Sequence, residues 1–136
     1  MGIAMKIWRK RMTVIVLSIC LFLSGCAKTE IIGGSVEHDK LVDGVYEGSY
    51  KGGPNKAVVK VTIEKQKIVK IEIVEHDAWK GKKAEPIIPQ RIIDQQSTNV
   101  DAVSGATNSS KVIMNAVQNA LGKAYNTSND DETGKK

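Results

Sequence analysis

Two segments in the first half of the chain alternate hydrophobic and polar residues with a period of two. Their apolar positions, which would share one face, are Val59, Val61, Ile63, Val69, Ile71 and Ile73. The alternation predicts strands over residues 57–63 and 68–74, each with one buried and one charged face, joined by a short hairpin connection at 64–67. A weaker alternation over 44–50 predicts a preceding strand, and the Gly- and Pro-containing stretch 51–55 predicts a turn.

In the second half of the chain the apolar spacing changes to three and four residues. Residues 86–95 predict a short helix with Pro89 in its first turn. A longer helix to about Tyr125, capped by Asn108 or Ser109, is predicted by the apolar positions Val112, Ile113, Ala116, Val117, Ala120 and Leu121. We therefore expect an α+β fold, in which two helices pack on an antiparallel meander and the last helix starts at the Ser-Gly-Ala-Thr turn.

The N-terminal segment has a basic stretch at 6–11 followed by an apolar run at 12–23. The run is shorter than the roughly 20 apolar residues of a membrane-spanning helix, and it suits a signal peptide. It ends in Leu-Ser-Gly-Cys, and small residues before a cysteine resemble a bacterial lipobox. The resemblance implies that residues 1–25 are a lipoprotein signal peptide. It also implies that a lipidated Cys26 anchors the protein to the bacterial cell membrane, outside the cytoplasm; the alternative is an ordinary signal peptide with an incidental cysteine.

Outside the predicted signal peptide, the net charge is close to zero and indicates no particular partner. The formal net charge is +5, but four basic residues lie in the leader, which leaves 16 basic against 15 acidic residues. This near balance gives no reason to expect a nucleic-acid partner, which would require clustered basic residues on the folded domain. Trp8 and Phe22 also fall in the leader, so we expect an aliphatic core.

The remaining chain divides by pattern into three parts. Residues 26–42 have no sustained period and contain Gly-Gly-Ser, so we expect the lipidated cysteine and a flexible tether spanning roughly 20–25 Å. Residues 43–125 form the folded domain. Residues 126–136 are polar, and we expect a disordered tail.

The candidate chemistry lies at the start of the last helix, in the string Asp-Ala-Val-Ser-Gly-Ala-Thr at 101–107. A helix start has unsatisfied N–H groups at the positive end of its dipole, which suits a phosphate. Gly105 and Ala106 would allow the backbone to approach such a group closely. Hydroxyl and amide residues before an apolar run are also ordinary helix caps, and local pattern alone does not separate these two interpretations.

The string resembles the flavinylation motif of the FMN-binding domain family, which includes the periplasmic subunits of sodium-pumping quinone reductases and related electron-transport complexes. The resemblance extends from Asp-Gly-Val-Tyr-Glu-Gly at 43–48 to Leu121. It implies FMN as cofactor, carried on Thr107 through a phosphoester bond. A separate flavin transferase that uses FAD and a divalent cation would attach it and release AMP. The cofactor-binding residues implied are Thr107, Ser104, Gly105, Ala106, Asp101, Asn108, Ser109 and Ser110.

The family often has a Glu-Thr-Pro-Gly loop after its last strand, whereas this chain has Ala-Trp-Lys-Gly-Lys-Lys at 78–83. Trp79 could stack on the flavin ring or cover the core, and the sequence leaves both open. We expect no metal site, because His38 and His76 lack the i, i+4 spacing of helical metal motifs. No hydrolase triad and no dinucleotide-binding glycine motif is present.

Three functions remain open from the sequence. The first is a lipid-anchored electron-transfer flavoprotein, rather than a stand-alone enzyme, which takes electrons from an unidentified membrane donor. The second is a module that binds or senses FMN without a covalent bond. The third is a non-redox surface lipoprotein whose helix cap mimics the motif.

Overall fold

The computed structural model describes residues 29–130, which form one three-stranded sheet and two helices. The predicted signal peptide, Cys26 and the end of the tail lie outside the described residues. The elements in chain order are η2 (His38–Lys40), β1 (Gly44–Gly52), β2 (Asn55–Glu64), β3 (Lys67–Asp77), η3 (Lys82–Ala84), α2 (Ile88–Gln95) and α3 (Thr107–Asp130).

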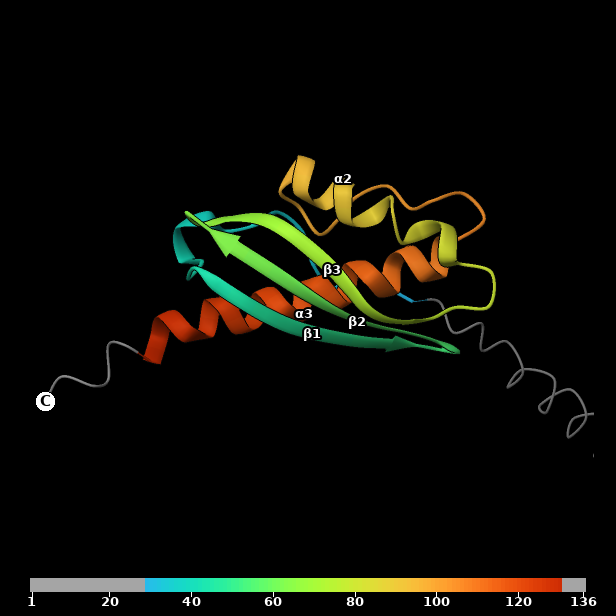
Figure 1. The fold of residues 1–136 in the computed structure, drawn as a ribbon, viewed down its shortest axis with the longest axis horizontal. Coiled ribbons are helices and arrows are strands. Elements are labelled where there is room, and N and C mark those ends of the chain that lie inside the picture. Colours follow the sequence, from blue (N-terminus) through green and yellow to red (C-terminus); the bar gives the residue numbers. More distant parts are fainter. Residues whose placement is uncertain (1–28, 131–136) are drawn as a thin grey trace, which may run out of the picture.

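The sheet is an antiparallel meander in the order β1-β2-β3. Tight hairpins join the strands, because Gly52 pairs with Asn55 at one end of β2 and Glu64 pairs with Lys67 at the other. Helix α3 crosses β1 and β2, while α2 lies against β3 (Figure 1). The predicted α+β fold with two helices on an antiparallel sheet is therefore confirmed.

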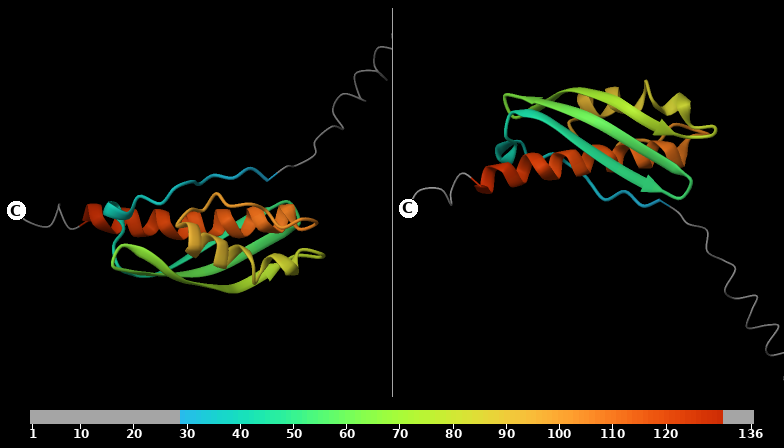
Figure 2. Two further views of the ribbon diagram at one scale, coloured as in Figure 1. Left: turned by 90° about the horizontal axis from the view of Figure 1, so that it is seen from above. Right: turned by 60° about the horizontal axis from the view of Figure 1, so that its bottom comes forward.

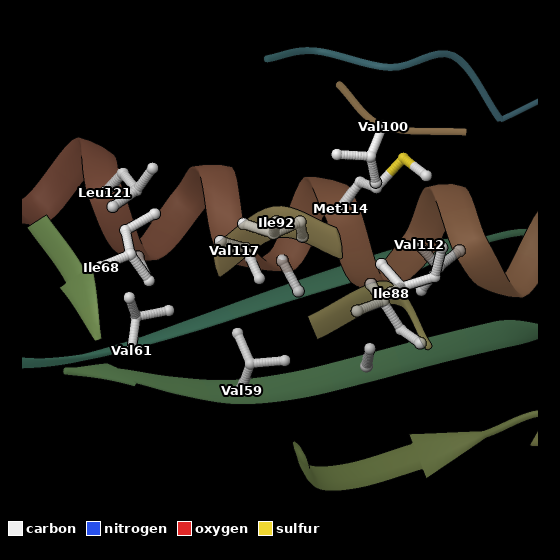
Figure 3. Packing of buried hydrophobic residues seen from close by; sticks show 14 of the residues in the cluster. Val59, Val61, Ile68, Ile88, Ile92, Val100, Val112, Met114, Val117 and Leu121 are labelled. Atoms are coloured by element: carbon white, nitrogen blue, oxygen red, sulfur yellow. The ribbon is translucent and has the colours of Figure 1, made fainter. Parts of the chain in front are cut away.

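The core lies between the inner face of the sheet and the two helices (Figure 3). Strand β2 contributes Ala57, Val59, Val61 and Ile63, all with 1% exposure or less. They meet the apolar side of α3 and two isoleucines of α2. The fully buried apolar side chains of the helices are Ile88, Ile92, Val112, Ile113, Met114, Ala116, Val117, Ala120, Leu121 and Ala124. Within the described part of the chain, every buried hydrophobic residue is aliphatic, as predicted.

The prediction for the buried face of β3 is wrong at Val69. The register against β2 shifts between Thr62 and Ile63, so that Ile63 pairs with Ile68. Ile68 is consequently buried, whereas Val69 is 43% exposed. A bulge inserts one extra residue into a strand, so that side chains before the bulge point to the opposite face from the one that simple alternation predicts. Simple alternation could not reveal this shift.

The prediction of a flexible tether is also wrong for residues 29–42. Val36 and Leu41 are buried in the main core. The backbone N–H of Thr98 donates to the carbonyl of Gly34 over 2.9 Å, which fixes the segment beside the loop after α2. This segment runs along α3 (Figure 2). Val36 and Leu41 pack here although they follow no periodic pattern, because the folded core supplies their apolar partners.

Helix α3 is longer than predicted, since it continues through residues 126–130. The expectation that disorder begins at 126 is therefore wrong for these five residues. Among the described helices, none combines the length and apolar character needed to cross a bilayer.

A carboxylate orders the β2–β3 hairpin and makes it sensitive to acid. Lys65 and Gln66 have positive φ angles of 51° and 60°. Asp43 accepts hydrogen bonds from their backbone N–H groups over 2.8 and 2.9 Å. These bonds to Gln66 and Lys65 lower the pKa of Asp43 below its ordinary value of 3.8. The stabilisation is therefore complete above about pH 4 and is lost as the pH falls through the lower pKa of the folded state.

We expect Asp43→Ala to lower the melting temperature at pH 7, and the difference from the wild type to shrink as the pH falls toward 2. Thermal unfolding followed by circular dichroism across this pH range tests the expectation. Asp39→Ala is the matched control, because no hydrogen bond of the Asp39 carboxylate occurs within the described residues. A difference that stays constant from pH 7 to pH 2 would contradict the role of the charged carboxylate.

Candidate functional site

The Ser-Gly-Ala-Thr turn leads directly into the first turn of α3. Gly105 adopts a left-handed φ of 73°, which glycine accepts without strain. The carbonyl of Ala106 accepts a hydrogen bond from the N–H of Ser110 over 2.9 Å, so Ala106 occupies the cap position and Thr107 is the first helical residue. The prediction that Asn108 or Ser109 caps the helix is therefore wrong.

Ser110 holds this turn from inside the helix. Its buried hydroxyl accepts a hydrogen bond from the N–H of Val103 over 3.0 Å and donates to the carbonyl of Ala106 over 2.8 Å. The hydroxyl and the backbone N–H of Ser110 both donate to the carbonyl of Ala106, so neither donor is left for a phosphate. The predicted role of Ser110 as a donor to a ligand is replaced by a structural one.

The first three N–H groups of α3 have no acceptor within the described residues. They belong to Thr107, Asn108 and Ser109. Such groups carry the positive end of the helix dipole, and an anion that approaches them gains both hydrogen bonds and a favourable field. The helix start thus has the donor geometry of an anion site.

A cavity of about 240 Å³ opens onto these groups. It lies where the β1–β2 hairpin, the loop after β3 and the start of α3 meet. Its lining residues are Asn55, Trp79, Lys80, Gly81, Gly105, Ala106, Thr107, Asn108 and Ser109. Five of the eight predicted cofactor-binding residues therefore come together here. Ser104 and Asp101 are exposed and do not line the cavity, although the carbonyl of Asp101 accepts a hydrogen bond from Arg91.

The side chains behind the first turn are engaged within the protein. The amide of Asn108 donates to the carbonyl of Gly52 over 3.2 Å and accepts from the hydroxyl of Thr29. Asn108 therefore offers the cavity its backbone N–H alone. The hydroxyl of Ser109 accepts from the amide of Asn55 over 3.2 Å, which leaves its proton available to a ligand.

Sequence reasoning missed four residues of this site: Asn55, Lys80, Gly81 and Lys83. A Cβ at Gly81 would collide with the hydroxyl of Ser109, so the loop after β3 approaches α3 closely only because residue 81 is glycine. A Cβ at Gly105 would stand 2.7 Å from Nζ of Lys83, which places an ammonium group over the turn. The only sequence signal for the approach of this loop was Gly81, which stands between lysines more than 20 residues before the Ser-Gly-Ala-Thr turn.

Trp79 projects into solvent beside the cavity, with 95% of its surface exposed. The alternative that it covers the core is therefore wrong. Nζ of Lys80 lies 5.9 Å from the centroid of its ring. An indole of this size left uncovered next to Thr107 offers a flat surface on which a planar ligand can stack.

His76 takes no part in the cavity. It lies within β3, where Nδ1 is 2.9 Å from Oε1 of Glu85 and the side chain is 1% exposed. Across residues 29–130, no three His, Cys, Asp or Glu side chains are grouped so that they could hold a metal ion.

A larger groove of about 590 Å³ runs between β3 and α2. Its lining includes Lys70, Ile73 and Ile93, but none of the predicted site residues. Helix α2 has only eight residues, and Pro89 in its first turn has no N–H to offer an anion. We therefore take the smaller cavity as the candidate functional site.

We expect Ser110→Ala to destabilise the domain by about 1–3 kcal/mol, because it leaves the buried N–H of Val103 without an acceptor. Urea denaturation measures the change in the free energy of unfolding. Ser104→Ala is the matched control in the same turn, since Ser104 is exposed and should change stability by less than about 0.5 kcal/mol. Equal stability of the two variants would show that the Ser110 hydrogen bonds do not hold the turn.

Comparison with known proteins identifies the family of the domain. The sequence profile of the FMN-binding domain family matches residues 51–122, more than half of the chain. Over 85 residues the chain is 36% identical to an uncharacterized protein of Treponema pallidum and 35% identical to an NADH:acrylate oxidoreductase of Vibrio harveyi. These matches cover 60% of this chain but 23% and 8% of the two relatives, so the chain spans less than a quarter of either.

The residues at the cavity fit the phosphate end of FMN. Three free N–H groups, the positive pole of α3 and the ammonium of Lys83 provide donors and charge for an anion. Gly81 and Gly105 keep side-chain bulk away from it, and Trp79 offers a flat apolar surface alongside. All the residues that line the cavity, and Lys83, fall within the segment that matches the family, residues 51–122. The chain belongs to the FMN-binding domain family, and FMN is its cofactor.

Proposed function

We propose that this protein is an electron-transfer flavoprotein anchored on the outer side of a bacterial cell membrane, with FMN attached covalently to Thr107. The observation that carries the proposal is the position of the Thr107 hydroxyl. Thr107 is exposed, is the first residue of α3, and lies on the cavity with the three free N–H groups. A phosphate bonded to this hydroxyl would sit within reach of those donors.

The cavity lacks the groups that would let Thr107 react unaided. Its lining contains no carboxylate and no imidazole that could take the hydroxyl proton. A threonine hydroxyl without a general base is a poor nucleophile. We therefore assign the attachment to a flavin transferase with FAD and a divalent cation as co-reactants. The Thr107 oxygen would bond to the FMN phosphorus, AMP would leave, and the hydroxyl proton would be released.

The protein's own part is to hold the flavin and set its surroundings. FMN, when bound, supplies the redox chemistry. The free N–H groups and Lys83 stabilise the charge of the phosphate diester. The flavin ring would extend from the phosphate toward the exposed side chain of Trp79. A covalent bond also prevents loss of the cofactor by dilution outside the cell, which agrees with the predicted lipoprotein leader and Cys26.

Intact mass of the full chain, expressed in bacteria with and without an active flavin transferase, tests the covalent attachment. We expect a gain of one FMN unit only with the transferase. No gain, with the transferase verified on another substrate, would overturn covalent attachment and leave reversible FMN binding or a non-redox role. An FMN titration of the purified protein then separates these two.

Fractionation tests the membrane anchor independently. We expect the flavin fluorescence to follow the membrane fraction, and Cys26→Ser to release it. A wild-type protein found wholly in the soluble fraction would overturn the anchor without affecting the flavin assignment.

We expect Trp79 to stack on the bound flavin and quench its emission. Trp79 is the only tryptophan after Cys26, so the tryptophan fluorescence of the mature chain reports this residue alone. Trp79→Ala should brighten the flavin several-fold at equal loading, whereas Trp79→Phe should brighten it less. Unchanged flavin emission in Trp79→Ala would place the ring elsewhere.

A further inference from the structure

The described chain begins beside the flavin site. The hydroxyl of Thr29 donates to the side-chain carbonyl of Asn108, the residue after Thr107. A Cβ at Gly52 would also meet the side chain of Thr29, so Thr29 packs closely against the end of β1. Figure 1 shows the start of the described chain, in blue, near the beginning of α3 and far from its C-terminal end.

Hydrogen bonds hold the following residues on the domain. The side chain of Asn115 is fully buried; it donates to the carbonyl of Glu30 over 2.6 Å and accepts from the N–H of Ile32 over 3.0 Å. The carbonyl of Gly34 accepts from the N–H of Thr98. The segment therefore cannot swing away from α3 without breaking these bonds and exposing Asn115.

We propose that the end of the domain that carries the flavin faces the membrane and lies against its anionic surface. The inference rests on the lipid anchor at Cys26 proposed above. Cys26 lies three residues before Thr29, and three extended residues reach only about 10 Å. The short connection holds the Thr107 end next to the bilayer, in place of the longer flexible reach expected from the sequence.

The surface at this end suits anionic lipid headgroups. The loop after β3 carries Lys80, Lys82 and Lys83, all exposed and none in an ion pair with any described residue. Lysines near an anionic leaflet are attracted to it over a Debye length. The nearest acidic residue before them is Asp77, a single charge against three lysines, while Glu75 is paired with Nζ of Lys56 and Glu85 with Nδ1 of His76.

The opposite end of the domain would point away from the membrane. Helix α3 has 24 residues and is therefore about 36 Å long. The β2–β3 hairpin lies at the end of the sheet far from Thr107, because β2 runs from the site at Asn55 to Glu64. An orientation in which the flavin faces the bilayer brings it close to a reductant in the membrane and leaves the hairpin exposed to the exterior.

Quenching by the membrane surface tests this orientation in the full lipoprotein loaded with FMN. Lys82→Cys and Glu64→Cys place single free thiols at the two ends of the domain, since the sulfur of Cys26 is blocked by lipid. Both positions are exposed and neither lines the cavity. Each variant is labelled with the same fluorophore and reconstituted into vesicles of phosphatidylglycerol and phosphatidylcholine that contain a lipid with a nitroxide on its headgroup.

We expect the label at position 82 to be quenched at least three-fold more strongly than the label at position 64. Added salt, or vesicles of phosphatidylcholine alone, should reduce this difference. Equal quenching at both positions, with the protein bound to vesicles, would overturn the orientation while leaving the anchor intact. Failure to bind vesicles would instead refute the anchor, and flavin loading is read separately by intact mass.

Discussion

Thr107→Ala should abolish the covalent attachment of FMN. Thr107 offers an exposed hydroxyl beside the free N–H groups of α3, and alanine removes that hydroxyl together with one methyl group. The mass gain produced by the flavin transferase should disappear, together with flavin fluorescence on a denaturing gel. The fold should persist, because Thr107 is exposed and its side chain makes no hydrogen bond within the described residues.

Two further variants make this result specific. Thr107→Ser keeps a hydroxyl at the same backbone position and should retain part of the mass gain. Ser104→Ala removes the other exposed hydroxyl of the motif and should leave the gain intact. Full flavinylation of Thr107→Ala would refute the assignment, and loss of flavinylation in Ser104→Ala alone would move the attachment to Ser104.

Gly48→Ala should destabilise the domain by about 3 kcal/mol, the upper end of the usual range for overpacking. Gly48 lies in β1 where the strand meets α3, and a Cβ there would collide with the carbonyl of Ala116 and the N–H of Ala120. These atoms belong to the backbone of the helix, so no side chain can rotate away. The strand and helix must separate, which also disturbs the neighbouring core.

Gly122→Ala is the matched control for this variant. Gly122 lies inside α3, and outside its own stretch of helix no described atom lies within 4 Å of the position that its Cβ would take. Because alanine is favoured over glycine in a helix, the change should stabilise the protein by up to about 1 kcal/mol. Urea denaturation of both variants should therefore give effects of opposite sign. A neutral Gly48→Ala would show that β1 and α3 are less tightly packed than the structure indicates.

The orientation proposed for the Thr107 end depends on residues 29–42, whose packing the sequence did not reveal. Residues 29–42 show no hydrophobic periodicity, because they form no long helix or strand. A sequence without periodicity looks the same whether the segment is packed or flexible. Their partners are Asn115 and Thr98, more than 60 residues away. Contacts of this kind arise only when the chain is folded.

Local pattern determined the elements of this protein. The period of two identified the three strands, and the spacing of three and four identified both helices, because these periods follow from the geometry of the backbone itself. The Ser-Gly-Ala-Thr string identified the cofactor through its resemblance to a family, while its position before an apolar run located it at a helix start. Five of the eight residues so predicted line the cavity.

Tertiary structure decided the remaining features. The bulge at Val69, the cap at Ala106 and the structural role of Ser110 depend on which groups meet in space. The far side of the site, with Asn55, Gly81 and Lys83, comes from segments separated from the motif by 20 to 50 residues. A periodic pattern records which face of an element is buried, but it carries no information on which distant segment covers that face.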